Sequence, residues 1–146
     1  MHFQRWVDTH FSDLTLHSLG QVIQLGHDGD SCPQPSPIIR DFTVVDISGV
    51  HTVNVTFCRC AGSPHERIQI LRASWQPASW DRPQTAFMFN VLNSFQRLNL
   101  QGKTSGFDFY ESLECKVNGD GLRNIQVCER IAMICLLISL RHLESL

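Results

Sequence analysis

The sequence lacks a strong excess of charge of either sign. Its 146 residues carry 12 Lys and Arg against 14 Asp and Glu, a formal net charge of -2. A protein that binds nucleic acid over a wide surface through phosphate contacts needs a large basic face. The composition therefore excludes a strongly basic nucleic-acid-binding protein, and any contact with DNA has to be local.

The sequence also lacks an apolar run long enough to cross a membrane. The most apolar segment, Ile131 to Leu140, is well short of the roughly 20 residues that a spanning helix needs. The first residues, Met1 to Trp6, contain no apolar core of a secretory signal. We expect an intracellular, reducing location without a membrane partner, where six cysteines are thiols or metal ligands rather than disulfides.

Motifs for several common activities are missing. Gly26 and Gly29 are not followed by the Gly-Lys-Ser/Thr of a phosphate loop. Asp28 and Asp30 lie in a glycine-rich turn without the full ligand series of a calcium loop. No local signature supports a Cys-His nucleophile. There is no internal repeat, and we expect no enzyme activity, no catalytic residue and no small-molecule substrate.

The chain does contain four soft or borderline metal ligands that flank a predicted strand pair: His27, Cys32, Cys58 and Cys60. Three thiolates and one imidazole complete a tetrahedral zinc shell, and a complete shell is structural rather than catalytic. The Cys-x-Cys spacing is tighter than the usual gap, and His51 or His65 is an alternative fourth ligand. The other interpretation is a metal-free set of small buried residues with a turn histidine.

A β-hairpin is the clearest local prediction. The segments 42–47 and 50–57 are rich in β-branched residues and alternate in polarity, with a tight turn at Ser48-Gly49 between them. Period-two alternation places Val53, Val55 and Phe57 on one face and begins the opposite set at Cys58. The thiols of Cys58 and Cys60 should then point to the same side.

The segment before the hairpin has two interpretations. Thr15 can cap a short helix that Gly20 ends, followed by an extended run from Gln21 to Leu25. The alternative is a helix that continues through Ile23. The prolines between residues 33 and 37 predict a loop.

Three helices are predicted after the hairpin. The first begins at Ser63, with Pro64 at its first position, and runs to about Ser74. The irregular segment 75–83 follows, held by two packed indoles, and 85–90 is a strand or a helix start. The second helix covers about 91–100, and the third begins at Ser105 and ends at Asn118-Gly119.

These elements predict an α+β fold. We expect one domain containing a small antiparallel sheet with a β-hairpin, packed against three or four short helices and stapled by one zinc.

Several segments of the chain form a specific combination, although each alone would be a weak signal. They are Leu19-Gly20, Leu25-Gly26-His27 through Cys32-Pro33, Phe42 to Asp46, Gly49-Val50-His51, Phe57 to Cys60, Trp75 to Ala78, Arg82 to Phe87 and Asp108-Phe109-Tyr110. Together they resemble the CxC-type cysteine-cluster domain that accompanies KDZ transposases in fungal genomes, and the resemblance covers roughly residues 2 to 122.

The resemblance implies a zinc-chelating accessory module of a DNA transposase, with metal ligation at His27, Cys32, Cys58 and Cys60. It implies DNA or a transposase core as partner, and a nuclear location. Family members usually carry a further cysteine-rich stretch before the part matching Trp6 and an acidic catalytic core after the part matching Tyr110. Neither is found here, so transposition itself is not implied.

The resemblance also divides the chain into a cysteine-cluster domain, 1–122, and a divergent apolar tail, 123–146. The tail suggests self-association. A metal-free structural or nonfunctional remnant and a small Cys/His hydrolase are the alternative functions.

Overall fold

The computed structural model describes residues 3–7, 10–14, 20–27, 30–79 and 81–118. Strands β1 (Phe3–Val7) and β2 (His10–Leu14) pair as an antiparallel two-stranded sheet, which the sequence analysis did not predict. The helix expected between Thr15 and Leu19, the indole of Trp80, the domain boundary at 122 and the apolar tail lie outside the described residues.

The main sheet has five strands: β3 (Val22–Gln24), β4 (Ile39–Asp46), β5 (Gly49–Thr56), β6 (Trp75–Pro77) and β7 (Thr85–Met88). Their spatial order is β3-β5-β4-β7-β6. The pairs β4–β5 and β6–β7 are antiparallel, whereas β3–β5 and β4–β7 are parallel. The fold class α+β is confirmed, but the expectation of a purely antiparallel sheet is wrong, because both parallel pairs join strands that are distant in the sequence.

The predicted hairpin is β4–β5, and its turn is shifted by one residue. Asp46 pairs with Gly49, so Ile47 and Ser48 form the two-residue loop and Gly49 begins the second strand. Gly49 has φ 137°, a backbone conformation that favours glycine. The hairpin prediction is therefore confirmed, although Gly49 belongs to a strand.

Two segments differ from the expectations in their secondary structure. Val22–Gln24 is extended, so the alternative helix through Ile23 is wrong. Trp75–Pro77 is a strand rather than an irregular segment, and the ring of Trp75 stacks on Phe42, with 6.4 Å between ring centroids. Pairing with β7 organises this proline-containing segment at the edge of the sheet, where a proline is tolerated.

The described residues contain three helices, α1 (Glu66–Arg72), α2 (Phe89–Gly102) and α3 (Gly106–Asn118). Helix α1 begins later than predicted: its N-cap is His65, whose side chain accepts the Arg67 amide. Ser63 is therefore not the cap. The predicted cap of α3 is confirmed, because Ser105 Oγ accepts the Asp108 amide at 3.1 Å and donates to its carboxylate at 2.7 Å.

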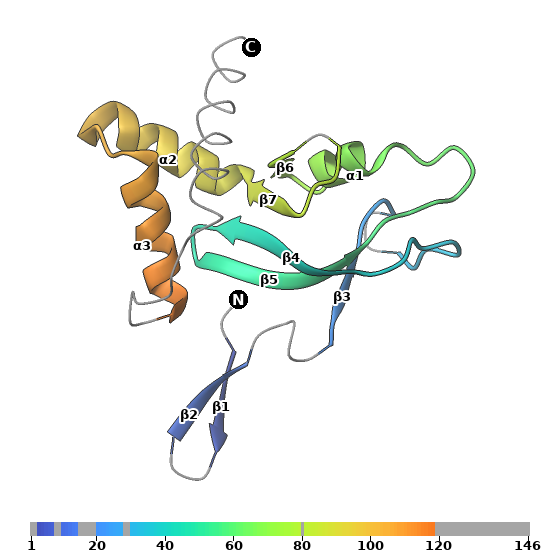
Figure 1. Ribbon diagram of the computed structural model, residues 1–146, viewed down its shortest axis with the longest axis horizontal. Coiled ribbons are helices and arrows are strands. Elements are labelled where there is room, and N and C mark those ends of the chain that lie inside the picture. The colour runs from blue at the N-terminus through green and yellow to red at the C-terminus, as the bar shows by residue number, and fades with distance from the viewer. Residues whose placement is uncertain (1–2, 8–9, 15–19, 28–29, 80, 119–146) are drawn as a thin grey trace.

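The helices cover the two faces of the main sheet (Figure 1). On one face, α2 and α3 pack against β4, β5 and β7, with a core of Val45, Phe87, Val91, Leu92, Phe95, Phe109, Tyr110 and Leu113. On the other face, α1 contributes Ile70 to a core that contains Leu25, Phe42, Val44, Val53, Val55, Phe57, Trp75 and Ala86. Val53, Val55 and Phe57 share this face, as the period-two pattern predicts. No helix among the described residues is long and apolar enough to cross a membrane.

Candidate metal centre

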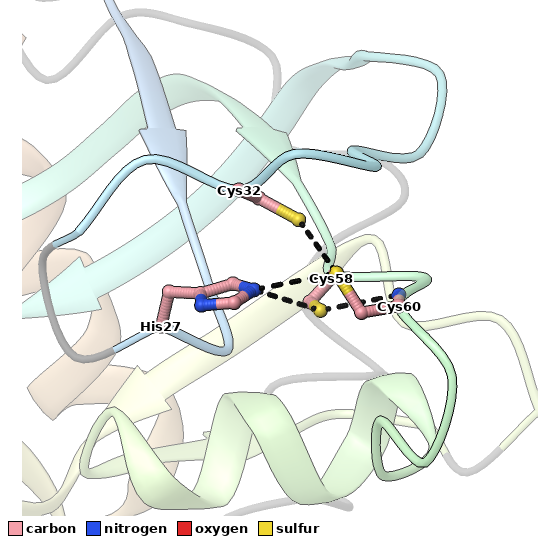
Figure 2. A group of neighbouring side chains, drawn as sticks. All are labelled: His27, Cys32, Cys58 and Cys60. Atoms are coloured by element: carbon pink, nitrogen blue, oxygen red, sulfur yellow. Dashed lines mark hydrogen bonds between the residues drawn. The ribbon is translucent and has the colours of Figure 1, made fainter.

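Four side chains from three separate segments converge beside the ends of β3 and β5: His27, Cys32, Cys58 and Cys60 (Figure 2). His27 Nε2 lies 3.1 Å from Cys58 Sγ and 3.6 Å from Cys60 Sγ. The sulfurs of Cys32 and Cys60 are 3.7 Å apart and form no disulfide. All four ligand atoms lie within 4.8 Å of one another.

These separations fit a single tetrahedral ion. Zinc bonds of about 2.3 Å to sulfur and about 2.0–2.1 Å to nitrogen place tetrahedral ligands about 3.8 Å apart for two sulfurs and about 3.5 Å apart for sulfur and nitrogen. The Cys32–Cys60 and His27–Cys60 separations match these values within a few tenths of an ångström. The His27–Cys58 separation is shorter and is that of a hydrogen bond.

His27 reaches the cluster because β3 continues beside β5. The Leu25 amide donates to the Thr56 carbonyl at 2.9 Å, which extends the parallel pairing by one residue. Gly26 then turns the chain with φ 93°. A Cβ at Gly26 would collide with Gln69 Oε1 and would lie 2.8 Å from Cys58 Cβ. Glycine is therefore required there by both its backbone conformation and its close approach to the cluster.

Cys32 is positioned by the proline-containing segment that follows it. Pro35 forms an isolated antiparallel bridge with Cys58, and the Arg59 amide donates to the Gln34 carbonyl at 3.0 Å. The Ser36 amide donates to Phe57 O at 2.7 Å, and the Ser36 hydroxyl accepts the Phe57 amide at 3.0 Å. The predicted loop is thus fixed along the chain that carries the Cys-x-Cys pair.

The two thiols of the Cys-x-Cys pair differ in acidity. The Cys60 amide donates to Cys58 Sγ at 3.4 Å, and this hydrogen bond is the main cause that lowers the pKa of Cys58 to about 7. The hydrogen bond with Cys58, followed by burial, raises the pKa of Cys60 to about 11. Within the Cys-x-Cys pair, the negative charge is therefore favoured on Cys58 and opposed on Cys60.

Gln69 of α1 is a part of the site that the sequence analysis missed. Its side chain is only 1% exposed. Its Oε1 accepts the Cys58 amide at 2.8 Å, and its Nε2 donates to the carbonyls of Cys58 and Pro64 at 2.9 and 2.8 Å. No sequence signal marked it, because an amide side chain has no metal-binding chemistry of its own, and the burial of Gln69 beside Ile70 is seen only in the structure.

Other residues considered from the sequence lie elsewhere. His51 Nε2 is 2.9 Å from Ser48 Oγ at the hairpin turn, and His65 caps α1. Neither belongs to the cluster, which takes its imidazole from His27. Cys115 is exposed on α3, and Cys128 and Cys135 lie outside the described residues.

The fold and the site define a small α+β domain built around a Cys3His cluster. A family model described as the CxC2-like cysteine cluster associated with KDZ transposases matches residues 16–121. The chain belongs to this family, which confirms the resemblance found in the sequence. A comparison with curated proteins found no match, and neither did one with solved structures.

Proposed function

We propose that His27, Cys32, Cys58 and Cys60 hold one structural Zn²⁺. The observation that carries this proposal is the approach of one imidazole nitrogen and three sulfurs to within 4.8 Å of one another. Three soft thiolates and an imidazole favour zinc over the hard cations Mg²⁺ and Ca²⁺. The ion would join the turn after β3, the proline-containing segment and the end of β5.

The domain then acts as an accessory module of a KDZ-type transposase rather than as an enzyme. Four protein ligands fill a tetrahedral shell and leave no position for a metal-bound water, which metal-assisted hydrolysis requires. The family association supports the link to transposases. The module contributes a surface that binds DNA or a protein partner such as a transposase core. Either partner would place the protein in the nucleus.

Metal analysis tests the zinc proposal. Protein purified under reducing conditions and dialysed against metal-free buffer should contain about one zinc per chain by elemental analysis. A strong chelator should remove the metal and lower the unfolding temperature, and added Zn²⁺ should restore it. A metal-free protein whose unfolding is insensitive to both chelator and zinc would contradict the proposal.

Salt-dependent binding separates the two kinds of partner. If the module contacts DNA, a gel-shift titration with random duplex DNA should show affinity that falls as salt rises. The slope should be shallow, because a contact that is only local neutralises few phosphates. If the partner is the transposase core, DNA should not shift at any salt concentration, and a purified KDZ transposase should bind the zinc-loaded module in pull-down. Failure in both assays would count against the accessory role and leave the zinc site standing.

A further inference from the structure

We infer that Gln69 is the positioning residue of the metal centre and that it couples metal binding to the docking of helix α1. This inference rests on the proposed zinc site and extends it to a side chain that supplies no ligand atom. Figure 2 shows α1 passing beneath the cluster, so that the helix lies against the segments that carry the ligands.

The first observation is the pair of hydrogen bonds between Gln69 and the backbone of Cys58. Oε1 accepts the Cys58 amide at 2.8 Å, while Nε2 donates to the Cys58 carbonyl at 2.9 Å. One amide side chain therefore pairs with both the backbone N–H and the backbone C=O of Cys58, as a residue of a neighbouring β-strand would. This fixes the backbone from which the Cys58 thiol extends.

The second observation is the contact of the same side chain with the opposite half of the site. Gln69 Oε1 lies against the position that a Cβ of Gly26 would take, directly before His27. Because Gly26 has no side chain, the turn that carries the imidazole can approach the glutamine closely. Gln69 thus touches the chain on both sides of the candidate ion, next to Cys58 and next to His27.

The third observation concerns what Gln69 does for the helix. Its Nε2 also donates to the Pro64 carbonyl at 2.8 Å, just before the N-cap of α1. All three hydrogen bonds are buried or partly buried, and the side chain is 1% exposed. A buried amide that loses its partners has no water to replace them, so displacement of the cluster from α1 would leave Gln69 unsatisfied.

The coupling follows from these contacts. Zinc holds Cys58 and His27 in the arrangement that Gln69 requires, and Gln69 holds Cys58 in the arrangement that zinc requires. By linkage, a substitution that removes the hydrogen bonds lowers the affinity for the metal. Removal of the metal in turn lowers the stability of the docked helix α1. Outer partners of metal ligands typically contribute about 10- to 100-fold to metal affinity.

The test compares Gln69→Met with a matched control. Methionine has a similar length and is apolar, so it fills the space and removes all three hydrogen bonds. The control, Asn99→Leu, removes a different amide hydrogen bond, from Asn99 Nδ2 to the Thr104 carbonyl at 3.0 Å, in the connection between α2 and α3. Zinc affinity is measured by competition with a chelator, and Co²⁺ binding by its visible ligand-field bands.

Gln69→Met should weaken zinc binding about 10- to 100-fold and alter the Co²⁺ spectrum, whereas Asn99→Leu should leave both unchanged. Equal zinc affinity of Gln69→Met and the unsubstituted protein would overturn the inference while leaving the zinc site intact. Absence of zinc binding by the unsubstituted protein would overturn both.

A second measurement needs no substitution and covers the case in which Gln69→Met fails to fold. Hydrogen exchange of the α1 amides in the unsubstituted protein should slow at least tenfold when zinc is added to the chelated form. Unchanged exchange in α1 on zinc binding would overturn the coupling.

Discussion

At the scale of single residues, the candidate ligands could be named from their chemistry, but their geometry could not. Thiols and imidazoles are uncommon enough that His27, Cys32, Cys58 and Cys60 stood out. His27 was the predicted imidazole ligand, and the family resemblance implied it as well. Spacing alone still left His51 or His65 as a possible replacement, because it does not say which ring reaches the sulfurs. Gln69 carried no metal-binding chemistry of its own and was missed.

Replacement of Cys58 should abolish tight metal binding. Cys58→Ser removes the thiol with the lowered pKa, and an alcohol does not ionise near neutral pH, so we expect zinc affinity to fall at least 100-fold. Cys115→Ser is the matched control, since Cys115 is exposed on α3 outside the cluster. Competition with a chelator measures both variants. Tight binding by Cys58→Ser would contradict the ligand assignment.

Zinc affinity should rise with pH. Cys58, with a pKa of about 7, gives up its proton near neutrality, whereas Cys60, with a pKa of about 11, still carries one when the metal arrives. Each displaced proton makes the affinity roughly tenfold higher per pH unit. We therefore expect at least a tenfold gain from pH 7 to pH 8 and a steeper gain from pH 6 to pH 7. Affinities that stay constant from pH 6 to 8 would refute this.

At the scale of elements, the sequence predicted those whose signals are local. The hairpin β4–β5, the capped start of α3 and the helix over 91–100 all depend on residues a few positions apart. The start of α1 was predicted wrongly, because Ser63 and Pro64 have the chemistry of a helix start. The structure uses Pro64 instead as an acceptor for Gln69 and caps the helix with His65.

The turn that delivers His27 should tolerate no side chain. Gly26→Ala introduces a Cβ at φ 93° against Gln69 and Cys58, so strain and overpacking should together cost about 2–4 kcal/mol. Gly20→Ala is the control: Gly20 has φ 67°, but nothing lies within 4 Å of its added Cβ. Its cost should be only about 1–2 kcal/mol. Denaturant unfolding of zinc-loaded protein measures both; equal losses would exclude the packing role of Gly26.

The hairpin turn should contribute stability that depends on acid pH. Burial raises the pKa of Asp46, but hydrogen bonds from Ser48 and Asn90 outweigh it, and the net pKa lies below the ordinary 3.8. A carboxyl group whose pKa is lower in the folded protein stabilises the fold at pH values above its pKa in the unfolded chain. This contribution is lost as pH falls below about 4. Asp46→Asn should lower the free energy of unfolding by about 1 kcal/mol or less at pH 7. It should also make the decrease of that free energy between pH 4 and pH 2 smaller. Denaturant unfolding between pH 2 and 7 measures it, and a variant with the parent pH profile would refute the role.

At the scale of the whole molecule, the candidate site and the α2–α3 layer lie at different places on the sheet. The cluster sits beyond the ends of β3 and β5, whereas the core around Phe87, Phe95 and Phe109 fills the face covered by α2 and α3. Figure 1 shows α2 and α3 at the opposite side of the molecule from β3. That core contains no metal ligand. Loss of zinc should therefore destabilise the segments around the cluster more than the core covered by α2 and α3.

Hydrogen exchange with and without a chelator should show this inequality. Chelation should speed exchange at the backbone amides of Leu25, Ser36 and Arg59, which are hydrogen-bonded around the cluster, by at least tenfold. Amides in the buried part of α2, around Val91 and Phe95, should change less than threefold. Uniform loss of protection would instead show that the domain unfolds as one unit without its metal.

The sequence by itself determined the α+β class, the hairpin, the helical segments and the types of candidate metal ligand, because each depends on residue chemistry or on neighbours within a few positions. Only the tertiary structure decided that β3 and β7 pair in parallel with distant strands, that the four predicted ligand atoms lie within 4.8 Å of one another and that Gln69 hydrogen-bonds to the Cys58 backbone. Those outcomes bring together segments more than ten residues apart, and their energies arise from backbone pairing and burial that no local pattern records.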